Sequence, residues 1–446
     1  MKKFFTTLSN IWKIDDLRVR ITNTLLFLLI YRVGSFVVLP GVNPATLNTK
    51  QAEGIAGLLN MFAGGSFSRA SIFALGVMPY ISASIVVQLL GIAVPYFAKL
   101  QKEGESGRNK LNQWTRYLTI GITAFQAIAY LKSQITVEQM QLANPYFTIL
   151  NMCVLTAGTM FVMWLGEKIT DKGIGNGISL IIMVGIISAL PGAFLTEFQS
   201  RTVGAGGLVT FIVEIIALIG VVMFTILIVQ GTRKVAVQYA KRIVGNKQYG
   251  GVRQYIPLKV TAAGVMPIIF AQALMFIPST VAQFFPNAAS NSILMSLADY
   301  TSWGHNILFA VLIIAFTFFY TAITVNPNQM AEDMKKNGGF VPGIKPGRAT
   351  GAFLDGVISR ITLPGAIALA IVAIIPAFAS MIHISSSFAR FFGGTSLIIL
   401  VQVVLDTLQQ IESHLLMRHY DGLMKSGRVK GRTAIPSAGG TSQPVI

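Results

Sequence analysis

Ten apolar stretches of roughly 20 residues follow one another along this chain, each long enough to cross the hydrocarbon core of a bilayer as a helix. Only 12% of the 446 residues are charged, whereas soluble domains carry about 25%. The sequence therefore predicts an all-α polytopic membrane protein with ten transmembrane helices. The stretches lie at residues 21–39, 73–93, 114–132, 148–166, 178–195, 209–230, 261–282, 304–323, 361–381 and 395–412.

The positive charges predict how the chain is oriented. Of the 35 Lys and Arg residues, 29 lie in the two tails and the even-numbered loops, which all fall on one side of the membrane. Loops rich in Lys and Arg stay on the cytoplasmic side. We therefore expect the N-terminal tail (1–20) and the C-terminal tail (413–446) to be cytoplasmic. No small-residue cleavage site follows the long apolar run from Ile21, so we expect no cleavable signal peptide.

The segment at residues 60–71, between the first two stretches, differs from both. Its glycines and serines, with Arg69, make it too polar and too short to cross lipid, yet Phe62 and Phe67 give it apolar surface to bury. Irregular backbone at membrane depth is tolerated only inside protein or along a water-filled cavity. We expect a short re-entrant piece, buried in the protein, that leads into a full span at residues 72–91.

Two cytoplasmic loops, 231–260 and 324–360, are longer than topology requires. The first contains seven basic residues, no acidic residue, and the aromatic residues Tyr239, Tyr249 and Tyr255. A basic surface of this kind suits RNA or an acid-rich protein partner. The alternative is that both loops only set the orientation of the spans.

The chain lacks the residue patterns of common enzymes and cofactor sites. It has no GxxxxGK[ST] phosphate loop, no nucleophile–base motif and no metal-ligand spacing around its histidines. We therefore expect no catalytic residue, no metal and no cofactor. The glycine-rich run at residues 173–177 follows a span and predicts a tight turn that opens the fifth span, with Asn176 as the candidate cap.

Few ionisable residues lie inside the spans. Arg32, Glu214 and Asp406 are the main ones, with Arg32 and Asp406 at greater depth. Energy-coupled transporters usually place such groups at ion or proton sites. Because these three do not form a chain of acids at the midplane, proton-coupled transport is disfavoured. The alternative role of each is a neutralised or capped residue in a helix bundle.

Small residues and prolines in the spans suit helices that pack closely and move. Pro79 and Pro267 interrupt the second and seventh spans, and each is expected to kink its helix, either for gating or only for packing. Small residues let helices approach closely; here they include Gly34, Gly76, Ser82, Ser84, Gly121, Gly158, Gly185 and Gly264.

Several long motifs resemble, in order, those of the SecY family, the channel subunits of bacterial protein translocases. The resemblance covers nearly the whole chain. It implies ten spans in two pseudo-symmetric halves, 21–195 and 196–412, around an hourglass-shaped pore. The motifs are GGSFSRASIFALGVMPYISASIVVQLL (64–90), KEGESGRNKLNQWTRY (102–117), GTMFVMWLGEKITDKGIGNGIS (158–179), YAKR (239–242), PLKV (257–260), GVMPIIFA (264–271), NPNQMAEDMKKNGGFVPGIKPG (326–347) and GGTSLI (393–398).

The resemblance also implies roles for the pore-lining residues. The segment at about 60–71 would be a plug that blocks the external funnel, with Phe62, Gly64, Gly65, Ser66, Phe67 and Arg69 as its main residues. A ring of isoleucines would form the narrowest point of the pore, at Ile81, Ile85, Ile178, Ile182, Ile269 and Ile399. Positions 81/85 and 178/182 are i,i+4 pairs, so each pair shares one helix face. A narrow apolar collar resists ion passage. Without the resemblance, ordinary core or lipid-facing isoleucines would be the alternative.

A lateral gate between spans 2 and 7 is the next implied feature. Its opening would expose the pore to lipid, so that a signal sequence or a nascent transmembrane helix can leave sideways. The candidate gate residues are Pro79, Ser82, Gln88, Pro267 and Gln272.

The implied partners dock on the basic cytoplasmic loops. The ribosome and the ATPase SecA would bind there in turn, through Arg233, Lys234, Lys241, Arg242, Lys247, Arg253, Lys345 and Arg348. SecE and SecG subunits would complete the complex. The family commonly has FVPGIRPG where this chain has FVPGIKPG with Lys345, and lysine lacks the planar fork of arginine. Either the partner geometry differs here, or Arg348 supplies the guanidinium.

The sequence as a whole predicts a protein-conducting channel of a bacterial cytoplasmic membrane, not an enzyme. It would thread unfolded preproteins across the bilayer or release apolar helices into it, driven by SecA or the translating ribosome. Two alternatives remain. A solute carrier would need a polar site at the midplane, and a membrane scaffold that only binds ribosomes would need neither a plug nor an apolar collar.

Overall fold

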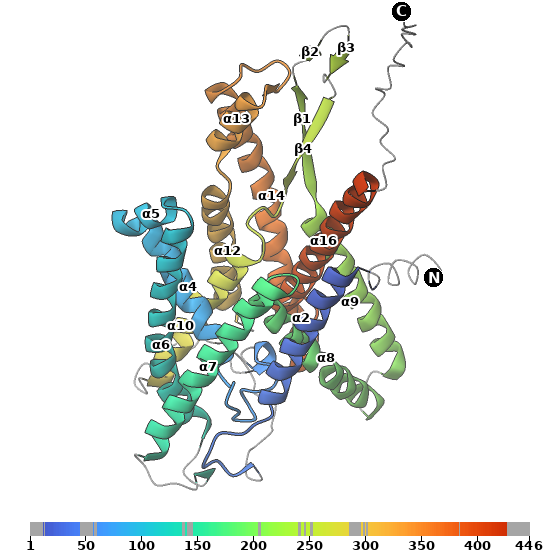
Figure 1. The fold of residues 1–446 in the computed structure, drawn as a ribbon. Helices are drawn as coiled ribbons and strands as arrows, with labels where there is room; N and C mark the ends of the chain where they lie inside the picture. The colour runs from blue at the N-terminus through green and yellow to red at the C-terminus, as the bar shows by residue number, and fades with distance from the viewer. Residues whose placement is uncertain are drawn as a thin grey trace, which may run out of the picture.

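The computed structural model shows a mainly helical protein with a small sheet at one end (Figure 1). The structure describes residues 12, 14–44, 57, 60–135, 139–140, 146–203, 207–239, 242–244, 247–249, 253–284, 296–297, 299, 302–382 and 384–425.

The helices follow the order of the predicted apolar stretches. The first group is α2 (Asp15–Gly34), α4 (Met78–Ala93), α5 (Pro95–Lys102), α6 (Glu105–Gln134), α7 (Tyr146–Lys172) and α8 (Gly177–Val203). The second group is α9 (Gly207–Gln230), α10 (Met266–Phe284), α12 (Trp303–Thr324), α13 (Pro327–Lys336), α14 (Arg348–Met381), α15 (Ser386–Ala389) and α16 (Gly394–Lys425).

A helix lies at each of the ten predicted stretches. By length and composition, six described helices can cross a membrane, namely α7, α8, α9, α12 continued into α13, α14 and α16. Helices α4 and α5 pass the same test as a pair, bent by 104° at the break between them. The chain is therefore a multi-pass membrane protein. Helices α2, α6 and α10 coincide with the remaining predicted stretches.

The second span begins later than the sequence predicts. We expected it to start at residue 72 or 73, but residues 72–77 form turns and α4 begins at Met78. Gly76 has a φ of +54°, a left-handed conformation that interrupts a helix. Pro79 then lies in the first turn of α4, where its missing N–H costs nothing.

The predicted proline kinks are wrong. Pro79 and Pro267 are each the second residue of their helix, α4 and α10. At this position a proline removes no hydrogen bond of the helix and fixes a helical φ. The two prolines therefore start the helices and do not bend them.

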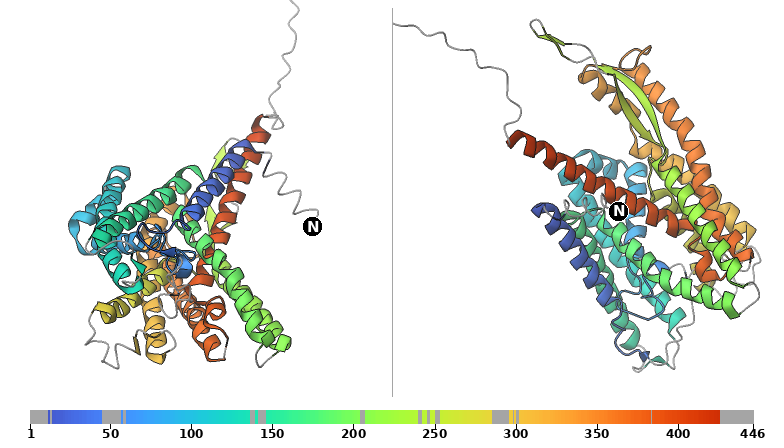
Figure 2. Two further views of the ribbon diagram at one scale, coloured as in Figure 1. Left: turned by 90° about the horizontal axis from the view of Figure 1, so that it is seen from below. Right: turned by 90° about the vertical axis from the view of Figure 1, so that its right-hand side faces the viewer.

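Three hydrophobic clusters form the core of the bundle. One is built from buried residues between 39 and 155, and a second from buried residues between 229 and 401. The third joins both parts of the chain, because it combines residues of α2, α4, α7 and α8 with residues of α14, α15 and α16. Seen from below, the helices surround this shared region (Figure 2).

The two long loops at residues 231–260 and 324–360 form one small domain, although the sequence predicted two separate loops. Strands β1 (Thr232–Tyr239) and β4 (Arg253–Lys259) form an antiparallel hairpin, and β5 (Gly339–Phe340) adds to β1 in the order β4-β1-β5. Strands β2 (Arg242–Val244) and β3 (Lys247–Tyr249) pair near the hairpin tip. Beneath the sheet, a cluster of apolar side chains joins it to α13 and α14: Val235, Val237, Leu258, Met334, Val341 and Leu354.

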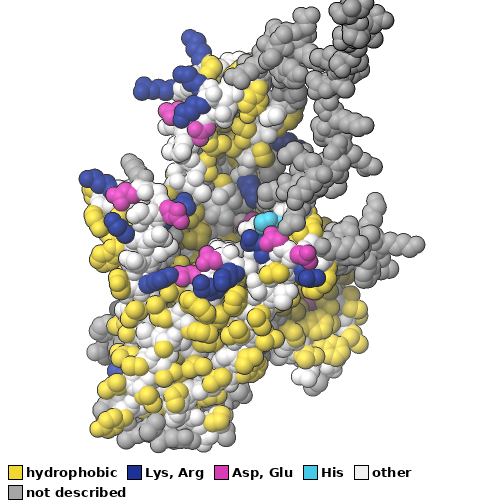
Figure 3. Space-filling view, viewed as in Figure 1, with side chains coloured by type: hydrophobic (Ala, Val, Ile, Leu, Met, Phe, Trp, Pro, Cys, Tyr) yellow, Lys and Arg dark blue, Asp and Glu magenta, His cyan; other side chains and the backbone are white. Residues whose placement is uncertain are grey.

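Charged and apolar side chains occupy different ends of the molecule. On the face shown in Figure 3, Lys, Arg, Asp and Glu gather over the end that carries α5, α13 and the hairpin, and hydrophobic side chains cover the opposite part. The start of α2 and the end of α16 lie toward the charged end (Figure 1). This distribution is the one expected for a membrane-embedded bundle with a polar cap.

Candidate functional site: a buried plug and an apolar constriction

The segment between α2 and α4 folds back into the middle of the bundle. Its residues Met61, Phe62, Ser66 and Phe67 are buried, so the expectation of a piece enclosed by protein is confirmed. We call residues 60–71 the plug segment. Asn60 closes it into a compact loop, because its side-chain Oδ1 accepts hydrogen bonds from the Ser68 N–H at 3.0 Å and the Ser68 hydroxyl at 2.8 Å.

The sharp turn at the tip of the plug segment needs two glycines. Gly64 and Gly65 have φ angles of +63° and +85°, which other residues rarely adopt. The Gly65 N–H donates to the Asn60 carbonyl at 2.7 Å. The two glycines therefore allow the backbone of the plug segment to make this turn.

Two arginines converge on this turn. Arg32 Nη1 of α2 and Arg69 Nη2 of the plug segment each donate to the Gly64 carbonyl oxygen at 2.7 Å. Both guanidinium groups also lie over the ring of Phe36, 4.9 Å and 4.3 Å from its centroid. Arg69 makes no salt bridge within the described part of the chain. Arg69 therefore closes the plug segment on itself, and Arg32 ties the same carbonyl to α2.

A tyrosine of α6 holds the far side of the plug segment. The Tyr130 hydroxyl donates to the Phe67 carbonyl at 2.6 Å, and the two rings meet edge to face at 4.8 Å. The end of the segment pairs with residues 37–39 at a single antiparallel bridge between Val38 and Ser71. There the Leu39 N–H donates to the Ala70 carbonyl at 2.8 Å and the Ile72 N–H to the Val37 carbonyl at 2.9 Å.

Glycines on the neighbouring helices let the plug segment approach their backbones. A Cβ on Gly185 of α8 would collide with the Phe62 carbonyl, and a Cβ on Gly158 of α7 would collide with the Ile72 carbonyl. We expected these two small residues to let helices approach one another, and each is in close contact with the segment that leads into α4. At Gly121 the expectation is wrong, because a Cβ added there would meet no heavy atom within 4 Å.

A small cavity of about 20 Å³ lies between α4, α8, α10 and α16 beside the plug segment, and we call it the constriction. Four of the predicted ring residues line it, one from each of α4, α8, α10 and α16: Ile81, Ile182, Ile269 and Ile399. The plug residue Phe62 lines it as well. The volume is enough for about one water molecule.

The other two predicted ring residues are close to the cavity but do not line it. Ile85 and Ile178 pack, partly buried, against the same hydrophobic cluster that contains Ile81, Ile182 and Ile399. The Ile178 side chain packs against Gly166 of α7. The structure therefore brings all six isoleucines into one cluster and four of them to the constriction.

Of the gate candidates, too, only some line the cavity. Ser82 of α4 and Gln272 of α10 both line the cavity, and the two helices are in contact. Pro79 and Pro267 lie buried at the helix starts. Gln88 donates to the Ser84 hydroxyl within α4 at 3.2 Å and does not line the cavity.

Sequence reasoning missed several lining residues. Met78, Ala273 and Thr395 also line the constriction. Met78 and Ala273 are one helical turn from a predicted residue, so helical spacing from Ile81 and Ile269 could have indicated them. Thr395 lies one turn before Ile399, so the same helical spacing could have indicated it.

Two of the charged residues expected in the spans differ in their surroundings. Glu214 of α9 is neutralised, as the alternative interpretation held, because its Oε1 lies 2.6 Å from Arg201 of α8, which also bonds Glu197 Oε1 at 2.9 Å. None of these three side chains is more than 11% exposed. The second oxygen of Glu197 accepts from the Ser385 N–H at 3.0 Å, so this ion cluster ties α8 and α9 to the chain just before α15. Asp406, which we expected deep in its span, is half exposed, 3.9 Å from Lys259 Nζ.

The turn at residues 173–177 behaves as predicted. Asn176 Oδ1 accepts from the Ser179 N–H at 3.2 Å, which confirms Asn176 as a cap of α8. Gln410 of α16 accepts from the Gly175 N–H at 2.8 Å and thereby joins the turn to the last helix.

The docking candidates belong to the two long loops that form the small domain. Arg233, Lys234, Arg253, Lys345 and Arg348 are exposed. Arg242 and Lys247 belong to β2 and β3, and Lys241 lies outside the described residues.

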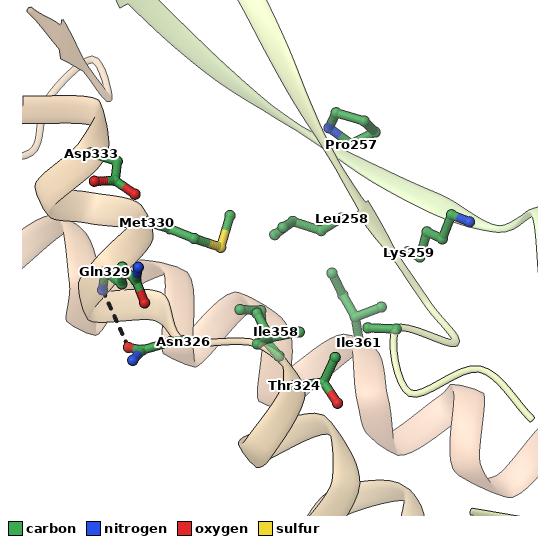
Figure 4. Close-up of a pocket in the computed structure, with 12 residues that line it drawn as sticks. Pro257, Leu258, Lys259, Thr324, Asn326, Gln329, Met330, Asp333, Ile358 and Ile361 are labelled. Carbon is green, nitrogen blue, oxygen red and sulfur yellow. Dashed lines mark hydrogen bonds between the residues drawn. The ribbon is translucent and has the colours of Figure 1, made fainter. Parts of the chain in front are cut away.

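A groove of about 510 Å³ opens at the base of this domain, between β4, α13 and α14. In Figure 4, Met330 and Leu258 point toward each other across it, and Ile358 and Ile361 rise from α14. Asn326 caps α13 at its rim by accepting from the Gln329 N–H at 3.2 Å. The polar side chains at its edge include Lys259 and Asp333.

Among the described residues, no group of three or more His, Cys, Asp or Glu side chains is placed to hold a metal ion. The candidate site consists of the constriction, the plug segment beside it and the basic domain at one end of the molecule.

Comparison with known proteins gives the family. The SecY family profile matches residues 71–408. The chain is 43% identical to protein translocase subunit SecY of Halalkalibacterium halodurans, covering 94% of this chain and all of the relative. It is 39% identical to protein translocase subunit SecY of Pseudomonas aeruginosa, covering 94% of this chain and 95% of the relative.

Solved structures share the fold. A structure described as "The structure of a protein conducting channel" matches with a TM-score of 0.66 at 18% identity, over 89% of this chain and 92% of the other. Sec61 in the canine ribosome-channel complex matches with a TM-score of 0.62 at 17% identity, over the same shares of the two chains. The profile covers most of the chain and the bacterial relatives match it almost from end to end, so the chain belongs to the SecY family.

Proposed function

We propose that this protein is the channel subunit of a protein translocase in a bacterial cytoplasmic membrane. It threads unfolded preproteins across the bilayer and releases transmembrane helices into it. The observation that carries the proposal is the constriction, where isoleucines from four helices surround a cavity of about 20 Å³ beside Phe62 of the plug segment. The chain would supply the passage, and partners would supply the energy.

The proposed architecture has ten spans in two halves, with both termini cytoplasmic. Two of the hydrophobic clusters support this division, because each contains residues from only one part of the chain. The contact between α4 and α10 lies where the two parts meet on one side, and that between α8 and α9 where the chain passes from one to the other. The cytoplasmic assignment of the hairpin follows from its basic residues.

Transport would require the plug segment to leave the constriction. Its bonds to Arg32 and Tyr130 hold it in the closed state. Once it is displaced, the isoleucine side chains can part around a polypeptide without breaking any specific bond, and close on one another afterwards. An apolar collar of this kind excludes ions because it does not hold a continuous column of water.

Lateral release would use the contact between α4 and α10. Ser82 and Gln272 line the constriction from these two helices, so separating the helices would open the passage toward lipid. An apolar substrate segment would then move into the bilayer by the same transfer of apolar surface that drives membrane insertion.

The partners would bind at the cytoplasmic domain. Sec61 and yeast Ssh1, whose folds this chain shares, are described in complexes with ribosomes. The exposed Arg233, Lys234 and Arg253 of the hairpin can contact RNA phosphates, which predicts binding that weakens with salt. SecA would use the same surface, with Lys345 and Arg348 at the turn before α14. SecE and SecG would be the companion subunits.

Site-specific crosslinking tests the proposal directly. A photoreactive amino acid replaces Ile81 or Ile269 in the constriction, or Ile187 on the exposed face of α8 as a control. A preprotein stalled during translocation should crosslink at the two constriction positions and not at position 187. Equal crosslinking at all three would contradict a central passage.

The crosslinking experiment together with a ribosome-binding assay separates the rival functions. A scaffold that only binds ribosomes gives ribosome binding without crosslinks at Ile81 or Ile269. A solute carrier gives neither preprotein crosslinks nor salt-sensitive ribosome binding.

A further inference from the structure

The two arginines at the plug segment form a cationic pair that, among the described residues, has no acidic partner. Arg32 and Arg69 share the Gly64 carbonyl as acceptor and the Phe36 ring as a neighbour. Neither forms a salt bridge with any acidic side chain in the described part of the chain. By contrast, Arg201, at 11% exposure, bonds two carboxylates. Two partly buried guanidinium groups held together in this way leave most of their N–H donors for another acceptor.

The Nε of Arg69 is buried, yet within the described residues it has no hydrogen-bond acceptor. Buried donors are almost always paired with protein, water or a ligand. The guanidinium fork matches the oxygen spacing of phosphate, with which it forms paired, charge-assisted hydrogen bonds. An oxygen-rich anion is therefore the acceptor that best fits this pair.

The position of the pair favours one source for that anion. Arg32 is in the last turn of α2, at the end remote from the basic hairpin (Figure 1). The outward face of α2 carries exposed apolar side chains toward this end, and Phe36, 55% exposed, follows the helix directly. Long Arg side chains near the end of a membrane span extend to the level of the lipid head groups. A head group of the leaflet opposite the hairpin would therefore meet Phe36 and the arginine pair together.

We propose that Arg32 and Arg69 form a binding site for the phosphate group of an anionic phospholipid, and that its occupation stabilises the closed plug segment. Both arginines already bond the Gly64 carbonyl, so an anion between them would offset their mutual repulsion and hold the turn in place. The choice of leaflet rests on the proposed orientation of the chain. The anion chemistry does not depend on that orientation or on the transport function.

Hydrogen exchange of the plug amides tests the proposal with the full-length chain in lipid nanodiscs. The backbone amides of residues 64–70 are followed in discs of phosphatidylcholine with and without phosphatidylglycerol. A third set contains phosphatidylcholine and millimolar inorganic phosphate, at constant ionic strength. We expect phosphatidylglycerol to slow exchange about tenfold, the effect of a ligand at roughly ten times its dissociation constant.

For each variant, amide exchange with phosphatidylglycerol is compared with exchange without it. The variants are not compared with one another, because the substitutions also remove bonds to the Gly64 carbonyl. The phosphatidylglycerol effect should vanish in the double variant R32Q/R69Q. It should persist in K132Q, since Lys132 is an exposed cation at the same end of the bundle, on α6. Protection by inorganic phosphate equal to that by phosphatidylglycerol would support the same site with free phosphate as its source.

Two results would overturn the site. One is exchange in the wild-type chain that is the same in all three conditions. The other is phosphatidylglycerol protection that remains in R32Q/R69Q. Failure of the channel function in crosslinking would leave this result unaffected, so the two proposals are tested separately.

Discussion

The Tyr130 hydroxyl of α6 donates a hydrogen bond of 2.6 Å to the carbonyl oxygen of Phe67 in the plug segment. Tyr130 is buried, so this carbonyl has no water as a substitute. The bond connects a membrane helix to the part of the chain that must move if the passage is to open.

Tyr130→Phe should therefore favour the open state. The substitution keeps the ring and leaves the buried carbonyl without a donor, which costs about 1–3 kcal/mol, or roughly a 5- to 150-fold change in the closed-to-open ratio. Ion currents of the reconstituted protein in planar bilayers measure this change. Tyr117→Phe is the control on the same helix, because Tyr117 is 68% exposed. Equal currents in the two variants would show that the Tyr130 bond does not hold the plug segment.

Gly185→Ala should destabilise the closed protein. The new methyl group would collide with the Phe62 carbonyl, and overpacking of this kind costs about 1–3 kcal/mol. Gly192→Ala on the same helix meets no atom within 4 Å and should be neutral or stabilising by up to about 1 kcal/mol, since alanine favours helix. Thermal unfolding in detergent compares them. A melting temperature for G185A at or above that of G192A would contradict the close approach of Gly185 to Phe62.

The two isoleucines of α4 should behave differently. Ile81 lines the constriction and Ile85 does not. In a chain that lacks residues 60–71, Ile81→Ser should raise the ion conductance by admitting water, whereas Ile85→Ser should change it little. Single-channel recording distinguishes them. If I85S had the larger effect, the narrowest point would lie one helical turn further along α4.

The buried ion cluster predicts an unequal response to neutralisation. Arg201→Met would leave Glu197 and Glu214 buried without a cation, a loss of about 3–5 kcal/mol. Glu214→Gln keeps the pair of Arg201 with Glu197 and should cost much less. Thermal unfolding of both variants checks the order. Similar destabilisation would mean that Arg201 is not the residue that compensates both carboxylates.

Much of the fold could be predicted from the sequence because a membrane span is a local property. About 20 apolar residues in a row define a span whatever its neighbours are. The start of a helix is a finer feature, and the prediction was wrong at α4. There the backbone leaves the plug segment through Gly76 before Pro79 begins the helix.

The hairpin of β1 and β4 has a sequence pattern that the prediction did not use. In β1, Val235 and Val237 alternate with less buried residues, the period of a strand with one covered face. Its pairing with β5 depends on residues about 100 positions later, namely Gln238 opposite Phe340, and no local pattern reports that.

The candidate site, too, was predictable only where local spacing or the family resemblance indicated its residues. The isoleucine positions came from the family resemblance and helical spacing, and four of them meet at one cavity. The acceptor shared by Arg32 and Arg69 is a backbone carbonyl. It could not be predicted from the sequence, because no pair of complementary side chains marks it. The bond between Glu197 and Arg201 was accessible, because the two are spaced i,i+4 on α8.

The most direct test of a plugged passage is the conductance of the reconstituted protein in planar bilayers, compared between the wild type and a chain that lacks residues 60–71. We predict quiet membranes for the wild type and fluctuating ion currents for the deletion. A deletion protein that is folded, inserted and silent would contradict both the plug segment and the constriction beside it.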